Sequence, residues 1–216
     1  MQHPIRLLAL AVLLGASSAS AAILDVTGPA STFGAAPEII DAPSSVLVGG
    51  ATNLGMQGFD EAQDVILSQD YATDQGSILA GTRVDSHMIL LNTTGRDVVY
   101  HSDVLWTFDG VIIGIMSDEY GAMEVASSGE LGAAGTSYLG APLYQRGLDP
   151  RFDAYSILGN QLRIQMSITT PGDWIRVVTA TPETPREEAP EPGTLALFGA
   201  GLAALVRLRY RQRSSK

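Results

Sequence analysis

Two histidines and two aspartates are spaced so that all four could lie on one surface. A chain reversal centred on Thr94 would bring His87 opposite His101 and Asp85 opposite Asp103. Side chains alternate along a strand with a period of two, so the four would then share one face. Imidazole nitrogens and carboxylate oxygens bind zinc and related ions. The spacing predicts a metal site, and unconnected strand residues are the competing interpretation.

A second group of carboxylates is concentrated between Gly58 and Asp74. Calcium takes about six to eight oxygen ligands and could use such a group. The spacing lacks the Asp-x-Asp-x-Asp run of an EF-hand loop, so a solvated acidic surface is the simpler interpretation. The carboxylates are those of Asp60, Glu61, Asp64, Asp70 and Asp74.

Nucleophilic catalysis has little support in the sequence. The chain has no cysteine and no Gly-x-Ser-x-Gly motif. Ser86 and His87 are sequence neighbours, and adjacent residues of a strand point to opposite faces. We therefore predict a protein that is not an enzyme and needs no cofactor, although a glycosidase-type pair of carboxylates remains an alternative.

Three aromatic residues suggest another alternative, a secreted carbohydrate-binding module. Trp106, Trp174 and Tyr155 could stack on sugar rings if they were exposed on one sheet face. At alternating strand positions, core packing is the more frequent role of such residues.

The elements that must position these residues are predicted to be strands. Between Ile23 and Thr179, short β-rich runs alternate with turn dipeptides, and we expect no long helix there. The stretch Ala126–Pro142, rich in Gly, Ala and Ser, is predicted to be a surface loop. The fold class is all-β: an antiparallel, jelly-roll-like β-sandwich over residues 22–179.

Two turns in this region have specific predicted consequences. Gly159-Asn160 suits a type II′ hairpin turn, which pairs Leu158 with Gln161 and Ile157 with Leu162. Asp109-Gly110 is a type I′ signal and predicts a turn joining the apolar runs on either side of it.

Composition restricts the partners and the mode of stabilisation. The 216 residues carry a formal net charge of -10 and no cysteine, so there is no disulfide and no thiolate site. Residues 22–189 hold 22 Asp and Glu against 7 Arg, whereas residues 190–216 hold one acid against five basic residues. An acidic body makes nucleic acid an unsuitable partner. The basic end suits an anionic membrane surface.

The N-terminus has the features of a signal peptide. Arg6 precedes the apolar run Leu7–Leu14, which is too short to span a bilayer of about 30 Å. Ala19 and Ala21 supply small residues at the cleavage site, so we expect signal peptidase to cut before Ala22 and remove residues 1–21.

The C-terminus has the features of a membrane segment. A Pro- and Glu-rich linker at 180–189 leads to Pro190-Glu191-Pro192. A short transmembrane helix is predicted at 194–208, and the arginines from Arg207 onward are expected to stay in the cytoplasm.

The order of these C-terminal elements resembles the PEP-CTERM sorting signal of exported proteins in Gram-negative bacteria. The resemblance covers residues 190–216 and rests on Pro190-Glu191-Pro192, the following Gly193-Thr194-Leu195-Ala196-Leu197 and the basic end. It implies that exosortase, a membrane protease, recognises Pro190, Glu191 and Pro192. It also implies passage through the inner membrane to the cell surface or matrix, with extracellular polysaccharide as a further partner. The sequence assigns no specific activity to the domain between the two ends.

Overall fold

The computed structural model describes residues 22–182, except residues 51, 94 and 96. The chain divides into two units, Met1–Pro182 and Glu183–Lys216. The predicted signal peptide, sorting motif and transmembrane helix all lie outside the described residues. Within residues 22–182, where described, no helix is long and apolar enough to cross a membrane.

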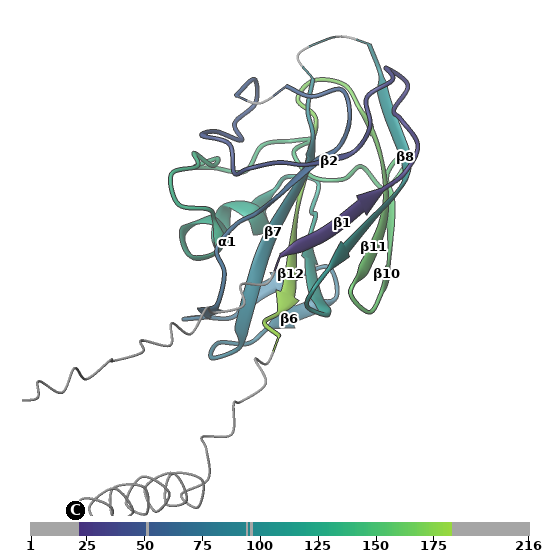
Figure 1. Cartoon of the computed structure of the whole chain (residues 1–216). Coiled ribbons are helices and arrows are strands. Elements are labelled where there is room, and N and C mark those ends of the chain that lie inside the picture. The colour runs from purple at the N-terminus through teal and green to yellow at the C-terminus, as the bar shows by residue number, and fades with distance from the viewer. Residues whose placement is uncertain (1–21, 51, 94, 96, 183–216) are drawn as a thin grey trace, which may run out of the picture. The chain divides into compact units, whose positions relative to one another are not determined.

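The described chain is mostly β, as predicted, with two large sheets and one small one (Figure 1). The first sheet is antiparallel and has the order β1 (Ile23–Thr27), β8 (Val99–Phe108), β11 (Gln161–Ile168), β10 (Ala154–Leu158). The second sheet has the order β2 (Glu38–Ile39), β3 (Gln57–Asp60), β7 (Arg83–Leu91), β12 (Asp173–Ala180), β9 (Ile112–Met116), and β4 (Val65–Ile66) also pairs with β7. A hairpin of β5 (Tyr71–Thr73) and β6 (Gly76–Ile78) forms the third.

The two large sheets share one apolar core. Trp106 and Leu162 from the first sheet pack in the same buried cluster as Ile89 and Ile175 from the second. Strand β11 shows why the sequence folds this way: its apolar residues alternate with polar ones, so that every second side chain is buried. Burial of these side chains supplies the main stabilising contribution in a domain without disulfides.

Strands β7 and β12 lie in the middle of the second sheet and are buried on both faces. Ile89 and Ile175 face the shared core, whereas Leu90 and Trp174 pack in a separate cluster on the opposite face. A covering layer that includes the helix α1 (Ala122–Leu131) makes this second burial possible, because Leu131 packs in one buried cluster with Val84 of β7 and Val178 of β12. Nearly every position of these two strands is therefore inaccessible to solvent.

The Gly159-Asn160 hairpin has the predicted register. Leu158 lies opposite Gln161 and Ile157 opposite Leu162 in the pairing of β10 with β11. Gly159 has a φ of 63°, the value that a type II′ turn requires at its first central position. A two-residue loop fixes the register locally, which explains why the sequence was sufficient here.

Two other local predictions are wrong. The strands on either side of Asp109-Gly110 do not pair: β8 belongs to the first sheet and β9 to the second, so this segment is a crossover. Ala122–Leu131, which overlaps the predicted loop, forms a helix. The Asp118 carboxylate accepts hydrogen bonds from the N–H groups of Ala122 and Met123, at 2.7 and 2.9 Å, and so stabilises the first turn.

The first strand of the described chain begins next to the predicted cleavage site. Ile23 lies opposite Phe108 in the pairing of β1 with β8. Its N–H donates to Oδ1 of Asp60 at 2.9 Å, and the carbonyl of Ala22 accepts the N–H of Asp109 at 3.2 Å. The start of the proposed mature chain is thus held by hydrogen bonds to both sheets.

Candidate functional site

The predicted pairing of the two histidine strands is wrong. His87 lies on β7 in the second sheet and His101 on β8 in the first, because β7 pairs with β3, β4 and β12 instead. Asp85 accepts the N–H of Asp64, and Asp103 pairs with an arginine, so the four residues do not gather. Among the described residues, no three His, Cys, Asp or Glu side chains converge as metal ligands. The geometric basis of the metal-site prediction is therefore lost.

His101 has a structural role. Its Nδ1 accepts the N–H of Met56 at 2.9 Å, and its Nε2 donates to the carbonyl of Pro29 at 2.8 Å. Burial lowers the pKa of His101, so the neutral imidazole with one donor and one acceptor is favoured. Both ring nitrogens are then occupied, and neither has a lone pair for a metal.

His87 forms the contacts of a catalytic triad in a closed environment. Its Nδ1 lies 2.7 Å from Oδ1 of Asp60, and its Nε2 lies 3.1 Å from Oγ1 of Thr179. A hydroxyl, an imidazole and a carboxylate in this order resemble a nucleophile with its base and orienting acid. However, Thr179 and His87 are both 0% exposed, and the Phe108 ring lies 4.8 Å from the imidazole. A substrate cannot reach the hydroxyl, so the group is a polar part of the core.

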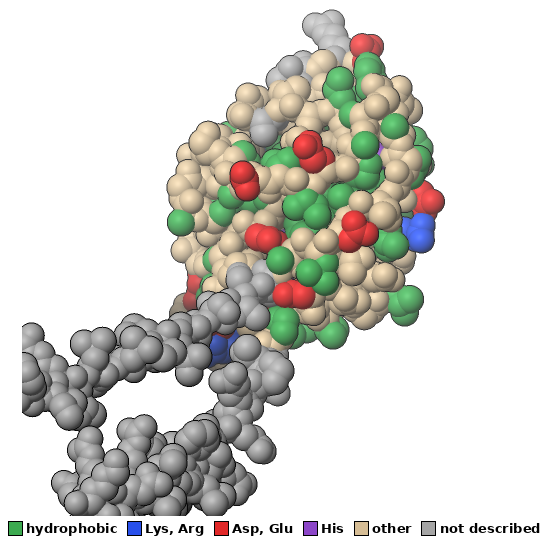
Figure 2. All heavy atoms as spheres, in the orientation of Figure 1, with side chains coloured by type: hydrophobic (Ala, Val, Ile, Leu, Met, Phe, Trp, Pro, Cys, Tyr) green, Lys and Arg blue, Asp and Glu red, His purple; other side chains and the backbone are tan. Residues whose placement is uncertain are grey.

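The carboxylates between Gly58 and Asp74 do not form one site. Asp60 bonds to His87, Asp64 pairs with Arg83, and Asp74 accepts the hydroxyl of Tyr155. Acidic side chains are scattered over the face drawn in Figure 2, where Lys and Arg are sparse. An acidic surface is thus the better description of this stretch, except that Glu61 is buried.

The aromatic residues proposed for sugar stacking are not available on a sheet face. Trp106 is 0% and Trp174 is 2% exposed. Tyr155 is half-buried and donates its hydroxyl to Asp74 at 2.7 Å, and burial together with this carboxylate raises its pKa. The core interpretation of the tryptophans is confirmed.

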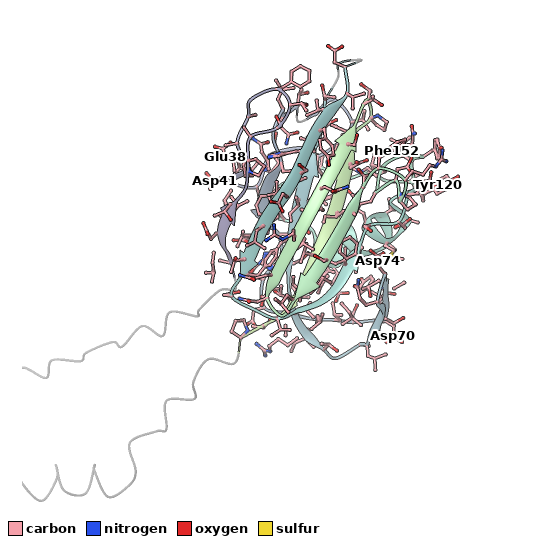
Figure 3. The ribbon with its side chains drawn as sticks, turned by 90° about the vertical axis from the view of Figure 1, so that its right-hand side faces the viewer. Glu38, Asp41, Asp70, Asp74, Tyr120 and Phe152 are labelled. Atoms are coloured by element: carbon pink, nitrogen blue, oxygen red, sulfur yellow. The ribbon has the colours of Figure 1, made fainter. Side chains whose placement is uncertain are left out.

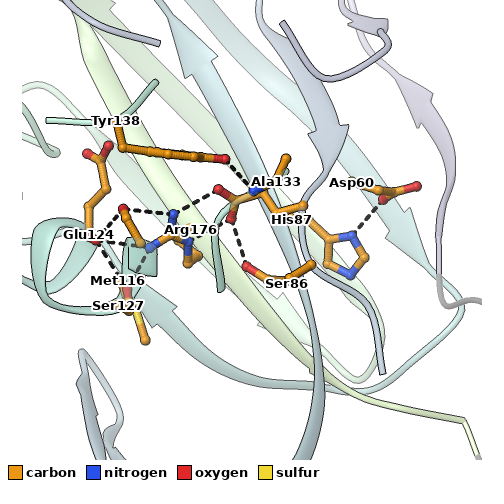
Figure 4. A network of polar contacts seen from close by, with 12 residues as sticks. Asp60, Ser86, His87, Met116, Glu124, Ser127, Ala133, Tyr138 and Arg176 are labelled. Atoms are coloured by element: carbon orange, nitrogen blue, oxygen red, sulfur yellow. Dashed lines mark hydrogen bonds and ion pairs between the residues drawn. The ribbon is translucent and has the colours of Figure 1, made fainter. Parts of the chain in front are cut away.

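Glu61 belongs to a buried ion pair that the sequence did not reveal (Figure 4). The Arg176 guanidinium donates to both carboxylate oxygens of Glu61, from Nε at 2.6 Å and from Nη2 at 2.8 Å. Ser86 adds a hydrogen bond to Glu61, and Ser127 of α1 accepts one from Arg176. Burial alone would lower the pKa of Arg176, but the Glu61 carboxylate reverses the effect and raises it.

A second buried pair connects α1 to the loop that follows it. The Arg146 guanidinium donates to both oxygens of Glu124, at 2.7 and 2.6 Å, and a third bond reaches the carbonyl of Val46. The same guanidinium stacks 3.5 Å above the Trp174 ring. Since Arg146 is 0% exposed, its position is fixed by contacts on every side.

Arg146 of the buried Arg146–Glu124 pair belongs to a loop, residues 143–148, that packs against the segment preceding α1. Leu143 donates its N–H to Tyr120, and Leu148 donates to Ser117. Arg146 donates its backbone N–H to Glu119 at 3.0 Å. The loop over residues 143–148 is therefore rigid, although it carries no regular secondary structure.

A pocket of about 250 Å³ lies beside this loop, where β11 ends and β12 begins. Gln145, Asp149, Asp153, Asp173 and Thr169 supply polar groups to its lining. No Arg or Lys lines it. The pocket is the best candidate for a binding site among the described residues, since it combines a concave shape with convergent polar groups.

Two carboxyl groups of this pocket, those of Asp173 and Asp153, are hydrogen-bonded to each other and hold one proton between them. Asp173 is 6% exposed, and burial, followed by the charge of Asp153 and a hydrogen bond to it, raises its pKa to about 9. Asp153 accepts the N–H groups of Ser167 and Asp149, at 2.7 and 2.6 Å, which favour its ionised form, while burial still raises its pKa. At neutral pH, Asp173 is the protonated member of the pair.

Sequence reasoning missed both the pocket and the ion pairs. The pocket residues come from three separate parts of the chain, so no local spacing marks them. One signal was present for the ion pair: Arg176 interrupts an otherwise apolar strand, which predicts a buried acidic partner.

Comparison with known proteins identifies a motif near the C-terminal end of the chain. The model of the PEP-CTERM protein-sorting motif matches residues 188–212, which include the predicted Pro190, Glu191 and Pro192. The chain therefore carries this sorting motif, in agreement with an exosortase substrate that is exported to the cell surface. No curated protein and no solved structure matches the chain.

Proposed function

We propose that the protein is an exported, non-catalytic surface protein whose β domain acts outside the inner membrane. The PEP-CTERM motif at residues 188–212 carries this proposal, because it implies processing by exosortase. Signal peptidase first releases a chain that starts at Ala22. Exosortase then recognises Pro190-Glu191-Pro192 and directs the domain to the surface or the polysaccharide matrix of a Gram-negative bacterium.

The architecture lets the domain be stable outside the cytoplasm without a disulfide. The domain has no cysteine, and its stability comes from the shared apolar core and the two buried ion pairs. Its fold in this proposal is an antiparallel β-sandwich, supported by the core that the two large sheets share. The jelly-roll-like connectivity, the signal helix and the short transmembrane helix remain predictions.

A hydrolase is the second candidate, favoured by one observation. Asp173, with its pKa raised to about 9, could donate a proton in the pocket. Against this role, Asp173 is only 6% exposed, and Asp153 already accepts two backbone hydrogen bonds. We therefore favour binding over catalysis.

Intact-mass measurement of the protein recovered from native cells tests the main proposal. We expect a chain that begins at Ala22 and ends near Pro190. A surface protein that retains Arg207–Lys216 would show an ordinary tail anchor and contradict exosortase processing. Glu191→Ala should block removal of the C-terminal tail and leave removal of residues 1–21 unaffected.

A further inference from the structure

Three exposed aromatic side chains lie on or beside the segments that form the acidic pocket. Tyr120 and Tyr144 are each 51% exposed, and their ring centroids lie 5.4 Å apart. Phe152 is 57% exposed and lines the pocket. Figure 3 shows Phe152 and Tyr120 on the same side of the domain. Soluble domains rarely display several large aromatic rings together unless the surface binds something.

The backbone that carries Tyr144 and Phe152 is held in place by the surrounding structure. Tyr144 is followed by Gln145, which lines the pocket, and by Arg146, whose buried ion pair fixes the loop. Phe152 lies in a tight turn in which the Asp149 carbonyl accepts N–H groups from Phe152 and Asp153, at 3.0 and 2.9 Å. Little conformational entropy is then lost when a ligand binds, which favours affinity.

The polar lining restricts the chemistry of the ligand. No Lys or Arg lines the pocket, although the exposed Arg151 places its Nε 3.7 Å from Oδ1 of Asp149. No three carboxylates converge on a cation among the described residues. The buried Asp173 carboxyl is the protonated member of its hydrogen-bonded pair with Asp153. Gln145 and Thr169 add an amide and a hydroxyl. The lining thus offers several hydrogen-bonding groups and the flat surface of Phe152, and it contains no positively charged residue.

We propose that this pocket, with Tyr120, Tyr144 and Phe152, binds a neutral carbohydrate chain. A sugar residue presents hydroxyls to the carboxyl and amide groups, and its C–H face to an aromatic ring. An acidic sugar would be repelled by the Asp153 carboxylate. The inference rests on the proposed function, since it requires that the domain is displayed outside the inner membrane.

Affinity electrophoresis tests the inference on the mature protein purified from native cells. The gels contain either a neutral soluble glucan, mannan or galactan, or the matrix polysaccharide extracted from the same cells. We expect at least one neutral polymer to retard the protein. Phe152→Ala and Tyr144→Ala should each weaken binding about tenfold, as loss of about 1.4 kcal/mol implies. Phe33→Ala provides a matched control, because Phe33 is 46% exposed and does not line the pocket.

Both pocket variants change exposed side chains, so their melting temperatures should equal that of the unmodified protein. Retardation by none of the polymers, by anionic polymers alone, or equally in all variants would overturn the inference. Intact mass on the same samples separates the two proposals. Correct termini without carbohydrate binding would reject the inference alone, whereas unprocessed termini would reject the proposed function.

Discussion

At the scale of single residues, the domain places several charges where water cannot reach them. Arg176, Glu61 and Arg146 are each at most 7% exposed, and each charged group has a partner of opposite sign. Desolvation of such charges is costly and is offset only when the geometry is good and the remaining hydrogen bonds are satisfied. Removing one partner should therefore have a much larger effect than removing an exposed charge.

We expect Arg176→Met to destabilise the domain by about 3–5 kcal/mol, because Glu61 would remain buried without a partner. Chemical denaturation measures this loss. The double substitution Arg176→Met with Glu61→Gln should recover part of it. Arg163→Met is the control, since the Arg163 side chain is 53% exposed and its ion pair should contribute less than about 1 kcal/mol. Equal losses in Arg176→Met and Arg163→Met would show that the buried pair is not specially important.

The carboxyl pair of the pocket should make stability depend on pH. The pKa of Asp173 is about 9 in the folded domain, against an ordinary value of 3.8. Between these values, the folded state holds a proton that the unfolded chain has released, so stability falls as the pH rises. Asn at this position stays neutral throughout. We expect Asp173→Asn to be more stable at pH 8 by up to about 6 kcal/mol, which is about 1.36 kcal/mol for each of roughly four pH units, and to match the unmodified protein below pH about 4.

Melting curves at pH 4 and pH 8 measure this effect, with a shift of roughly 2–4 °C for each kcal/mol. Asp25→Asn is the control, because Asp25 is exposed on β1 and lies outside the pocket. If Asp173→Asn lowered the melting temperature at pH 8, the ionised carboxylate would be the stabilising form and our assignment of the proton would be wrong.

At the scale of elements, local and non-local signals differ in what they determine. The Gly159-Asn160 turn specifies the β10–β11 register because both strands adjoin the loop. The partner of β7 was not predictable in this way, because apolar residues occupy both of its faces and do not identify a single buried side. The helix α1 was missed for a related reason: it buries Glu124 and Ser127 beneath Arg176, so its sequence lacks a clear apolar stripe.

Two glycines allow the turn and the helix to be tested together. Gly159 has a φ of 63°, and nothing lies within 4 Å of a Cβ built there, so Gly159→Ala should cost about 1 kcal/mol through backbone strain alone. Gly129 lies inside α1, also with open space around a Cβ, so Gly129→Ala should stabilise by roughly 0.5–1 kcal/mol. Thermal melting distinguishes the two signs. A destabilising Gly129→Ala would count against a helix at this position.

At the scale of the whole molecule, the sorting motif and the proposed binding pocket lie in different parts of the chain. Resemblance to a known sorting signal was enough to predict the C-terminal motif, because such signals are short and contiguous. The strand content was also predictable from period-two alternation. The pocket was not, since it depends on how two sheets and a loop meet in space.

The domain should be stable without its terminal segments. We expect a chain of residues 22–182 to unfold in one cooperative transition, because its core and both ion pairs lie within this range. A chelator should leave the transition unchanged, since no three described side chains converge on a metal. Calorimetry measures both. Two transitions, or a lower melting temperature after chelation, would require a second cooperative unit or a bound ion.

The pairing of β1 also has a consequence for the timing of export. Ile23 pairs with Phe108, so 85 residues separate the two partners along the chain. In the proposed export, β1 would cross the membrane first and could pair only after β8 had followed. At a synthesis rate of about 5–20 residues per second, this interval is roughly 4–17 s. The proposed cleavage between Ala21 and Ala22 has this period in which to occur on an unpaired strand. After β8 has paired with β1, the Asp109 N–H donates to the Ala22 carbonyl and holds the start of the proposed mature chain against the sheet.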